Sequence, residues 1–432
     1  MIFEPELEGM PREQLAALQL GRLRALVERV KERVPLYAER LADIDPEGIV
    51  SLDDVRHLPF TRKDDLRETY PLGMLATPRD ELRRIHGSSG TTGKPTIVAY
   101  TEADVDLFER VNARTLAMGG AEPGMMLHNA YGYGLFTGGL GLHGGGERLG
   151  LTVVPVSGGM TERQLTLIED LRPDVIACTP SYALTLAHAF AERGVGPDEI
   201  SLRYALVGAE PWTERMREEI DASLGVCCTN VFGLSEVIGP GVSCECVEER
   251  SGSHVNEDHF LPEVVDPESG EPLGEGEEGV LVFTTLTKEA LPLVRYWTGD
   301  ICSLSTASCS CGRTLARMGL IVGRSDDMLI IRGVNVYPSQ VGAVLGRMPE
   351  LSPHFGLVVR RLGTLDEVEV LAEVNGDVLP TLTDERVREL SDHAAGLIRE
   401  TIGTTMVVTL VQPGEAPRSD GGKIQRVRDL RS

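Results

Sequence analysis

Residues 12–45 repeat apolar side chains near helical spacing. The apolar positions among the glutamates and arginines are Leu15, Leu18, Leu20, Leu23, Leu26 and Val27. This pattern is typical of helices that bury one face, and Val34-Pro35 should break them because the residue before a proline disfavours the helical conformation. Downstream, Thr61 is expected to cap the next helix, and Thr101-Glu-Ala-Asp104 has the spacing of a capping box for a helix through Ala117.

Between residues 151 and 231, short apolar runs alternate with helical patterns. Strands are predicted at 151–156, 175–179, 204–207 and 226–231, and helices at 162–171, 181–193 and 214–224. This alternation predicts βαβ units on a largely parallel sheet, whose ligands should gather at the carboxyl ends of the strands. From about residue 264, glycine-punctuated strands predict antiparallel or barrel-like structure, and after residue 324 the pattern predicts a small α+β domain.

The composition is that of a globular protein with a strong negative charge. The chain has 432 residues, of which 41% are hydrophobic and 25% charged, and its net charge is −24. This length predicts two or three domains, and the charge argues against nonspecific binding to nucleic acid or to an anionic membrane surface. We expect a cytoplasmic protein, because residues 1–6 lack the features of a secretory signal and no apolar run approaches membrane-spanning length.

The segment His86–Pro95 has the composition of an anion-binding loop. It holds three glycines, four hydroxyl side chains and one lysine. Glycines let successive backbone N–H groups turn inward, while hydroxyls and a lysine add donors and charge, and together these groups suit a polyphosphate. The segment is not a Walker loop, because the Gly-x-x-x-x-Gly-Lys-Ser/Thr spacing is absent and Pro95 follows Lys94. The alternative interpretation is a flexible linker.

Small residues and carboxylates mark the ends of three predicted strands: Gly208–Pro211 follows one strand, Phe232–Glu236 follows another, and Tyr296–Asp300 ends a third with its carboxylate. An aromatic ring and exposed carbonyls at the edge of a parallel sheet suit a flat base such as adenine. Glu236 is a candidate ligand for Mg²⁺, and Asp300 is a candidate for binding ribose hydroxyls. The alternative is that these segments are ordinary turns that end strands.

These motifs resemble, in the same order, those of the adenylate-forming enzymes. They comprise the glycine loop, Gly208–Pro211, Phe232–Glu236, Trp297–Asp300, Gly323–Asp326 and a late glycine-lysine pair. Within this superfamily the chain is most similar to phenylacetate–coenzyme A ligase and related aryl-activating enzymes, through segments 131–139, 234–241 and 323–335. The resemblance covers nearly the whole chain.

The resemblance implies an α/β fold of two domains. Residues 1–325 would form an ATP- and acyl-binding domain of parallel-sheet βαβ layers with a small barrel-like β part, residues 326–328 a hinge, and residues 329–432 a mobile α+β lid. It also implies two half-reactions: a carboxylate attacks the α-phosphate of ATP and releases pyrophosphate, and a thiol then displaces AMP from the acyl-adenylate. Because little covalent chemistry falls to the protein, catalysis would depend on positioning and charge stabilisation.

The same resemblance assigns residues to each part of the nucleotide. The catalytic residues would be Lys423, which bridges carboxylate, ribose and α-phosphate, together with Lys94 and the magnesium ligand Glu236. The triphosphate would be held by Ser88, Ser89, Gly90, Thr91, Thr92, Gly93 and Lys94. Adenine would be surrounded by Gly208, Ala209, Glu210, Pro211, Asn230, Phe232 and Gly233. The remaining assignments are Ser235 near the carboxylate and phosphate, Asp300 and Arg324 at the ribose, and Asp326 at the hinge.

The resemblance also indicates an acyl pocket for a planar aromatic acid. Its expected lining is Tyr131, Phe136, Gly208, Ile238, Gly239 and Pro240. Two aromatic rings suit stacking on a substrate ring, and the lack of arginine or lysine in the set favours a monocarboxylate. The alternative for Tyr131 and Phe136 is core packing.

Three of the eight cysteines and one histidine form a candidate metal site. The residues are Cys246, His254, Cys309 and Cys311, which would make a closed Cys₃His zinc site of the structural type. Their spacing matches no common zinc finger. The resemblance supports the site, because some relatives in the phenylacetate-ligase branch carry these residues as a structural zinc site, while others lack them. The alternative is unpaired thiols in a reducing compartment. Four further cysteines are expected to pack in the core: Cys178, Cys227, Cys228 and Cys302.

We therefore expect an ATP-dependent aryl-carboxylate–CoA ligase that uses Mg²⁺. Its expected partners are an aromatic monocarboxylic acid, ATP and a thiol acceptor, with a second copy of the chain as a further candidate. One alternative is an enzyme that adenylates the acid but loads the phosphopantetheine of a carrier protein. Another is a nucleotide-binding regulator without activity, against which the intact Lys94, Glu236 and Lys423 argue. Trp297 and Gly299, beside Asp300, stand where close relatives commonly have arginine.

Overall fold

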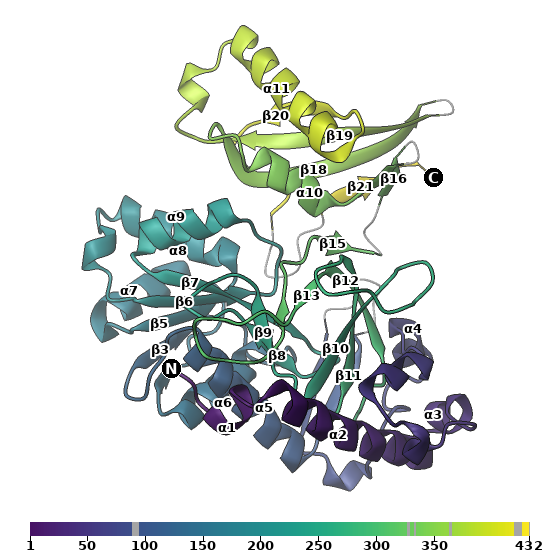
Figure 1. Cartoon of the computed structure of the whole chain (residues 1–432). Helices are drawn as coiled ribbons and strands as arrows, with labels where there is room; N and C mark the ends of the chain where they lie inside the picture. The colour runs from purple at the N-terminus through teal and green to yellow at the C-terminus, as the bar shows by residue number, and fades with distance from the viewer. Residues whose placement is uncertain (89–94, 326–328, 332–333, 363–364, 419–425, 432) are drawn as a thin grey trace. The chain divides into compact units, whose positions relative to one another are not determined.

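The chain forms two compact units, each described here by itself (Figure 1). The computed structural model describes residues 1–88, 95–325, 329–331, 334–362, 365–418 and 426–431. The first unit comprises Met1–Ala209 and Ile220–Leu320, and the second comprises Glu210–Glu219 and Ile321–Ser432. The predicted hinge at 326–328 lies outside the described residues, so the boundary at residue 325 stays a prediction. No helix in the described ranges is long and apolar enough to cross a membrane.

Helices cover the N-terminal part of the first unit, as the apolar spacing predicted. They are α1 (Pro5–Glu8), α2 (Arg12–Arg33), α3 (Pro35–Arg40), η1 (Pro46–Gly48), η2 (Leu52–His57), α4 (Lys63–Glu68) and η3 (Arg79–Glu81). Val34 is extended between α2 and α3, and Pro35 occupies the first turn of α3, where the missing N–H of a proline costs no hydrogen bond.

The prediction that Thr61 caps α4 is wrong. The cap position is Arg62, whose backbone N–H donates to the Asp65 carboxylate at 2.7 Å. The Thr61 hydroxyl is instead buried, where it donates to the Val294 carbonyl at 2.6 Å and lies 2.6 Å from the Tyr37 hydroxyl. The Thr61 side chain therefore forms a tertiary hydrogen bond with Val294 instead of the helix cap that the local pattern predicted.

The largest sheet of the described chain has nine strands and carries the predicted βαβ units (Figure 1). Its order is β13-β14-β9-β8-β7-β6-β5-β3-β4. The strands are β3 (Met126–Asn129), β4 (Thr152–Val154), β5 (Val175–Cys178), β6 (Tyr204–Gly208), β7 (Cys227–Leu234), β8 (Gly239–Cys244), β9 (Ser253–Val255), β13 (Leu304–Ser305) and β14 (Arg317–Met318). Strands β4, β3, β5, β6 and β7 are parallel, as predicted, whereas β8, β9, β14 and β13 continue the sheet antiparallel.

Helices pack against this sheet and bury its apolar side chains. They are α5 (Glu102–Met118), α6 (Gly138–Leu149), α7 (Thr161–Leu171) and α8 (Pro180–Glu192), with η4 (Pro197–Glu199) before β6. Helix α9 (Glu214–Leu224) has residues in both units. The predicted capping box of α5 is confirmed, because the Thr101 hydroxyl accepts from the Asp104 N–H at 3.1 Å while the Asp104 carboxylate accepts from the Thr101 N–H at 3.0 Å. One apolar cluster joins residues of α5 and α6 to residues of β3, β5 and β6, so the parallel strands and their helices share one core.

Two smaller antiparallel sheets complete the first unit. Strands β1 (Arg84–Gly87) and β2 (Ile97–Tyr100) form a pair on either side of the glycine loop. Strands β10 (Phe260–Val265), β11 (Gly279–Thr285) and β12 (Tyr296–Cys302) pair antiparallel, as predicted for this region.

The second unit has a mixed sheet and a separate core. Its sheet order is β20-β19-β18-β21, in which β18 and β19 are antiparallel. The elements are β15 (Gly323–Arg324), β16 (Leu329–Ile331), β17 (Val334–Val336), α10 (Pro338–Leu345), β18 (Leu351–Leu362), β19 (Leu365–Val374), η5 (Leu379–Thr381), α11 (Asp384–Ile402), β20 (Val407–Val411) and β21 (Val427–Asp429). Side chains of α10 and α11 pack on β18, β19 and β20 in one apolar cluster, which agrees with the predicted α+β pattern.

Candidate active site

The two ends of the glycine loop are held together by β1 and β2. Gly87 lies opposite Ile97, and the Ser88 N–H donates to the Thr96 carbonyl at 2.9 Å. The Ser88 hydroxyl is buried and has no hydrogen-bond partner among the described residues. A buried donor at the entrance of the loop fits a site that takes a polar ligand. The predicted triphosphate residues that fall outside the described chain are Ser89, Gly90, Thr91, Thr92, Gly93 and Lys94.

His86 begins this loop as a buried side chain. Its Nδ1 lies 3.0 Å from the Leu135 carbonyl, and its ring stands edge-on to Tyr100 with the centroids 5.4 Å apart. Burial lowers the pKa of His86, against the raising effect of the Leu135 carbonyl. The contact also ties the loop to the glycine-rich segment 131–139.

The end of β6 makes a sharp turn that only small residues allow. A Cβ at Gly208 would lie 2.0 Å from the Val231 carbonyl oxygen of β7, and Ala209 has a positive φ of 71°. Gly208 therefore lets the two strands pair, and Ala209 redirects the chain away from the sheet. Of the predicted adenine residues, Gly208 and Ala209 belong to the first unit, whereas Glu210 and Pro211 belong to the second.

The other predicted adenine residues lie on β7. Phe232 packs its ring 6.4 Å from that of Phe283, and the Asn230 N–H donates to the Glu245 carboxylate at 2.7 Å. A Cβ at Gly233 would lie 2.0 Å from the Gly239 carbonyl oxygen, so this position also needs glycine. The structure thus brings Gly208, Asn230 and Gly233 to the neighbouring strands β6 and β7.

Ser235 and Glu236 lie in a β-hairpin turn, which the sequence did not predict. Strand β7 continues to Leu234, which lies opposite Gly239 of the antiparallel strand β8. The N–H groups of Val237 and Ile238 donate to the Leu234 carbonyl at 3.1 and 3.0 Å. The predicted strand end after Val231 therefore falls three residues too early, and Glu236 is held in a tight turn with only 5% of its surface exposed.

The hairpin contacts the segment that contains the predicted aromatic residues of the acyl pocket. The Ser235 hydroxyl lies 3.3 Å from that of Thr137, and a Cβ at Gly239 would lie 2.6 Å from the Thr137 Cβ. Ile238 is fully buried. Phe136 has 50% of its surface exposed, so core packing does not explain this ring, and its role at the acyl group stays a prediction together with those of Tyr131 and Pro240.

The two predicted ribose residues occupy different units. Asp300 is buried inside β12, not at its end as predicted, beside a register shift in which Gly299 has a φ of 81°. Arg324 lies on β15 of the second unit. Trp297 packs edge-on against Phe60 at 5.1 Å. Lys423 and Asp326 lie outside the described residues, so their roles stay predictions.

The structure brings together the four predicted metal ligands, Cys246, His254, Cys309 and Cys311. Their ligand atoms all lie within 4.8 Å of one another, with 3.6 Å between the sulfurs of Cys246 and Cys309 and 3.4 Å between the Cys311 sulfur and His254 Nε2. Ligands of a tetrahedral zinc ion, with Zn–S of about 2.3 Å and Zn–N of about 2.0 Å, lie roughly 3.5–3.8 Å apart. The spacing therefore fits zinc.

The surroundings of this cluster also suit a metal. His254 Nδ1 faces the Leu315 carbonyl at 3.4 Å, a contact that directs Nε2 toward the thiols. The contact with Cys246, with help from His254, lowers the pKa of the Cys311 thiol. The same contact raises the pKa of the Cys246 thiol, and burial raises the pKa of the Cys309 thiol. A thiolate is the form of cysteine that binds zinc.

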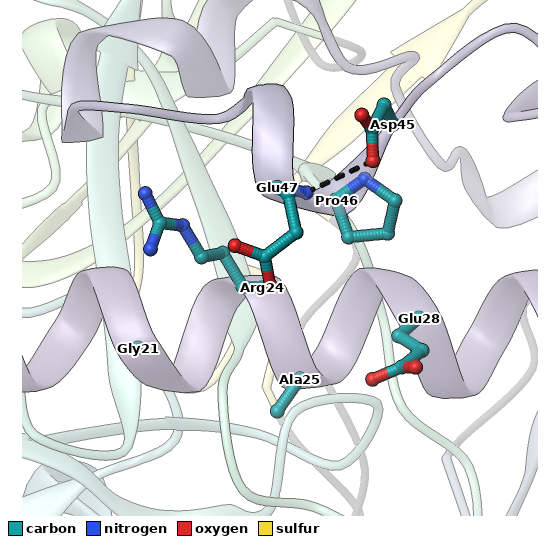
Figure 2. A pocket seen from close by; sticks show the side chains of 7 residues that line it. All are labelled: Gly21, Arg24, Ala25, Glu28, Asp45, Pro46 and Glu47. Carbon is teal, nitrogen blue, oxygen red and sulfur yellow. Dashed lines mark hydrogen bonds between the residues drawn. The ribbon is translucent and has the colours of Figure 1, made fainter.

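A surface hollow of about 360 Å³ lies away from all predicted site residues (Figure 2). It is lined by Gly21, Arg24, Ala25, Glu28, Asp45, Pro46 and Glu47. These residues come from α2 and the segment around η1, and they include no predicted nucleotide, acyl or metal residue. We assign no function to it.

Sequence reasoning missed the buried side chains that surround Glu236. The Lys288 ammonium donates to the Glu236 carbonyl at 3.0 Å, and the Tyr100 hydroxyl donates to the Ile238 carbonyl at 2.9 Å. The available signal was the pair Lys288-Glu289 within the largely apolar run 286–294, because a lysine is rarely fully buried unless it is paired.

The chain has the sequence features of an AMP-binding enzyme. Residues 16–286 match the family described as AMP-binding enzyme, and residues 333–431 match the AMP-binding enzyme C-terminal domain. The chain belongs to this family, and the predicted adenylate-forming fold is confirmed.

Within this family, the chain is similar over its full length to phenylacetate-coenzyme A ligases. The chain is 61% identical to phenylacetate-coenzyme A ligase of Thermus thermophilus, with 100% of both chains covered. It is 48% identical to phenylacetate-coenzyme A ligase of Escherichia coli, covering 99% of this chain and 97% of the relative. The crystal structure of 2-hydroxyisobutyryl-CoA ligase in the postadenylation state with 2-HIB-AMP is similar with a TM-score of 0.92 and 27% identity, covering 99% of this chain and 92% of that chain. The predicted resemblance to the phenylacetate-ligase branch is thereby confirmed.

Proposed function

We propose that the protein is an ATP-dependent aryl-carboxylate–CoA ligase that acts through an acyl-adenylate and releases AMP and pyrophosphate. The observation that carries this function is the 61% identity, over both full chains, with a phenylacetate-coenzyme A ligase. Phenylacetate is accordingly the first candidate substrate. The buried Glu236, the paired ends of the glycine loop and the small residues of β6 are compatible with it.

In the proposed mechanism the protein positions the reactants and stabilises charge. The glycine loop with Lys94 would bind the β- and γ-phosphates that leave together as pyrophosphate. Glu236 would hold Mg²⁺, which supplies positive charge to the phosphate oxygens. Lys423 would stabilise charge at the α-phosphate during adenylation.

The acyl group would bind beside the Ser235–Ile238 turn. Support comes from the contacts of Ser235 and Gly239 with Thr137, because these bring the turn to the segment that contains Tyr131 and Phe136. Two aromatic side chains of this segment suit stacking on an aryl ring.

We further propose that Cys246, His254, Cys309 and Cys311 bind a structural zinc ion. All four positions would be filled by protein ligands, so the ion would fix the loop that carries Cys309 and Cys311 and would take no part in the reaction. Three zinc-bound thiolates also suit a reducing compartment such as the cytoplasm.

A pyrophosphate-exchange assay over benzoate, phenylacetate, anthranilate and hydroxylated aryl acids tests the function. We expect ATP- and Mg²⁺-dependent exchange with at least one of these acids, and the best acid should then be converted to its thioester with CoA. If none of these aryl acids supports exchange, the proposal is overturned. Exchange followed by thioester formation on a carrier protein and not on CoA would replace it by the carrier-loading alternative.

A further inference from the structure

Lys288 is a buried cation bonded to the backbone of the residue proposed to bind magnesium. Only 2% of its surface is exposed, and its ammonium donates to the Glu236 carbonyl at 3.0 Å. The same ammonium lies 5.0 Å from the centroid of the Tyr100 ring, a favourable cation–π distance. A buried charge is costly unless it is paired, so this placement needs a reason.

The loop that carries Lys288 is anchored to the start of α5. The Asp104 carboxylate accepts from the N–H groups of Glu289 and Ala290 at 2.6 and 2.8 Å. The Thr101 hydroxyl lies 2.9 Å from the Glu289 carboxylate. These bonds fix the backbone on the C-terminal side of Lys288, so its ammonium has a defined position.

Tyr100 holds a second carbonyl of the same turn. Its hydroxyl donates to the Ile238 carbonyl at 2.9 Å, and its ring, which is fully buried, contacts His86 at the start of the glycine loop. Lys288 and Tyr100 therefore fix the Glu236 and Ile238 carbonyls of one hairpin turn.

The use of lysine at this position is itself informative. Only five of the 42 basic residues are lysines, and two of these are the proposed site residues Lys94 and Lys423. Lysine carries a compact ammonium on a flexible stem, whereas arginine carries a planar fork that suits bidentate partners such as carboxylates. Burial lowers the pKa of Lys288 to about 8, against the raising effects of Asp104 and Glu236.

We propose that Lys288 is a positioning residue for adenylation, which holds the turn that aims the Glu236 carboxylate at the magnesium ion of the bound nucleotide. The inference rests on the proposed function, because it takes Glu236 as the magnesium ligand. It concerns placement of the ligand, so the first half-reaction should depend on Lys288 more than the second.

Lys288→Met tests this role, because methionine fills similar space without a charge or donor. In pyrophosphate exchange we expect the rate to fall about tenfold or more and the half-saturating Mg²⁺ concentration to rise at least about threefold. Thioester formation from supplied acyl-AMP should stay within about twofold of the wild type. A variant with unchanged Mg²⁺ dependence, or with equal losses in both half-reactions, would overturn the proposal. Absence of exchange in the wild type would instead overturn the proposed function.

Lys31→Met is the matched control. The Lys31 ammonium also donates to backbone carbonyls, those of Ala42 and Ile44 at 2.9 and 2.7 Å, but on α2. We expect this variant to keep the wild-type Mg²⁺ dependence.

If Lys288→Met does not fold, Tyr100→Phe tests the same turn by removal of one hydroxyl. A rise of about twofold or more in half-saturating Mg²⁺ supports the positioning role, and an unchanged value overturns it.

Discussion

Arg114 and Asp258 form a fully buried ion pair with two hydrogen bonds. The distances are 2.8 Å from Nη1 to Oδ1 and 3.1 Å from Nη2 to Oδ2, and neither side chain is exposed. Nη1 also donates to Asn256, and Nε donates to Glu4 near the N-terminus. The pair therefore connects α5 to the segment after β9 and to the first residues of the chain.

Asp258→Asn should strongly destabilise the protein, because it leaves the Arg114 guanidinium buried with only part of its compensating charge. Loss of one partner of a buried pair costs about 3–5 kcal/mol, measurable by urea unfolding. The control is Asp106→Asn, also on α5, whose ion pair with Arg148 is partly exposed and should contribute at most about 1 kcal/mol. Equal effects of the two substitutions would contradict this account.

His259, next to this pair, should make the stability depend on pH. Burial lowers the pKa of His259 to about 3, against the raising effect of Asp258, while Arg114, Arg22 and Arg110 lower it further. In the unfolded chain a histidine has a pKa of about 6.5. Below that pH the unfolded state binds one more proton than the folded state, so stability is fully present above about pH 6.5 and is lost as the pH falls toward 3.

The expected loss from His259 is about 2 kcal/mol between pH 7 and pH 5, measured as the free energy of unfolding in urea. His259→Gln should remove this part of the pH dependence. The exposed His57 provides the control, since His57→Gln should leave the slope unchanged. If the curves of the wild type and His259→Gln run parallel, the assignment to His259 is wrong.

Local patterns predicted those elements that depend on residues close in sequence. The apolar spacing of α2, the capping box at Thr101 and the alternation from β4 to β7 all appear in the structure. Each depends on residues close in sequence, so hydrophobic period and capping chemistry suffice.

The errors lie where distant segments compete for a side chain or extend a strand. Thr61 bonds to Val294 instead of capping a helix, β7 continues to pair with β8 beyond Val231, and Asp300 lies within a strand. The positioning contacts of Lys288 depend on a residue 52 positions away. Family motifs identified candidate residues of the site, whose roles stay predictions, and these motifs carry no information about buried neighbours outside them.

Removal of the proposed zinc ion should destabilise the protein without abolishing adenylation. Cys309→Ser takes away one of the four ligands, and we expect the bound zinc to fall from about one ion per chain to near zero. The thermal midpoint should fall by roughly 5 °C or more, with pyrophosphate exchange of the folded protein within about twofold of the wild type. Cys227→Ser, on β7 and outside the cluster, should retain zinc. A wild-type protein without stoichiometric zinc would support the free-thiol alternative.

Gly208→Ala should damage both the sheet and nucleotide binding. The added Cβ would lie 2.0 Å from the Val231 carbonyl oxygen, which belongs to the backbone of β7 and cannot rotate away. We expect a loss of about 2–3 kcal/mol in stability and a rise of roughly tenfold or more in the KM for ATP. Gly21→Ala is the control, because a Cβ there meets nothing within 4 Å, and alanine within a helix should stabilise by about 0.5–1 kcal/mol.

Lys423→Ala should separate the two half-reactions. Lys423 follows two glycines near the C-terminus, and its single charge is proposed to stabilise the α-phosphate only while the acyl-adenylate forms. Pyrophosphate exchange should therefore fall by about a hundredfold or more, whereas thioester formation from supplied acyl-AMP should stay within about threefold. Lys63→Ala, at the start of α4, controls for loss of a lysine elsewhere and should change neither rate. Equal losses in both half-reactions would contradict a role confined to adenylation, because pyrophosphate has already left when the thiol attacks the acyl-adenylate.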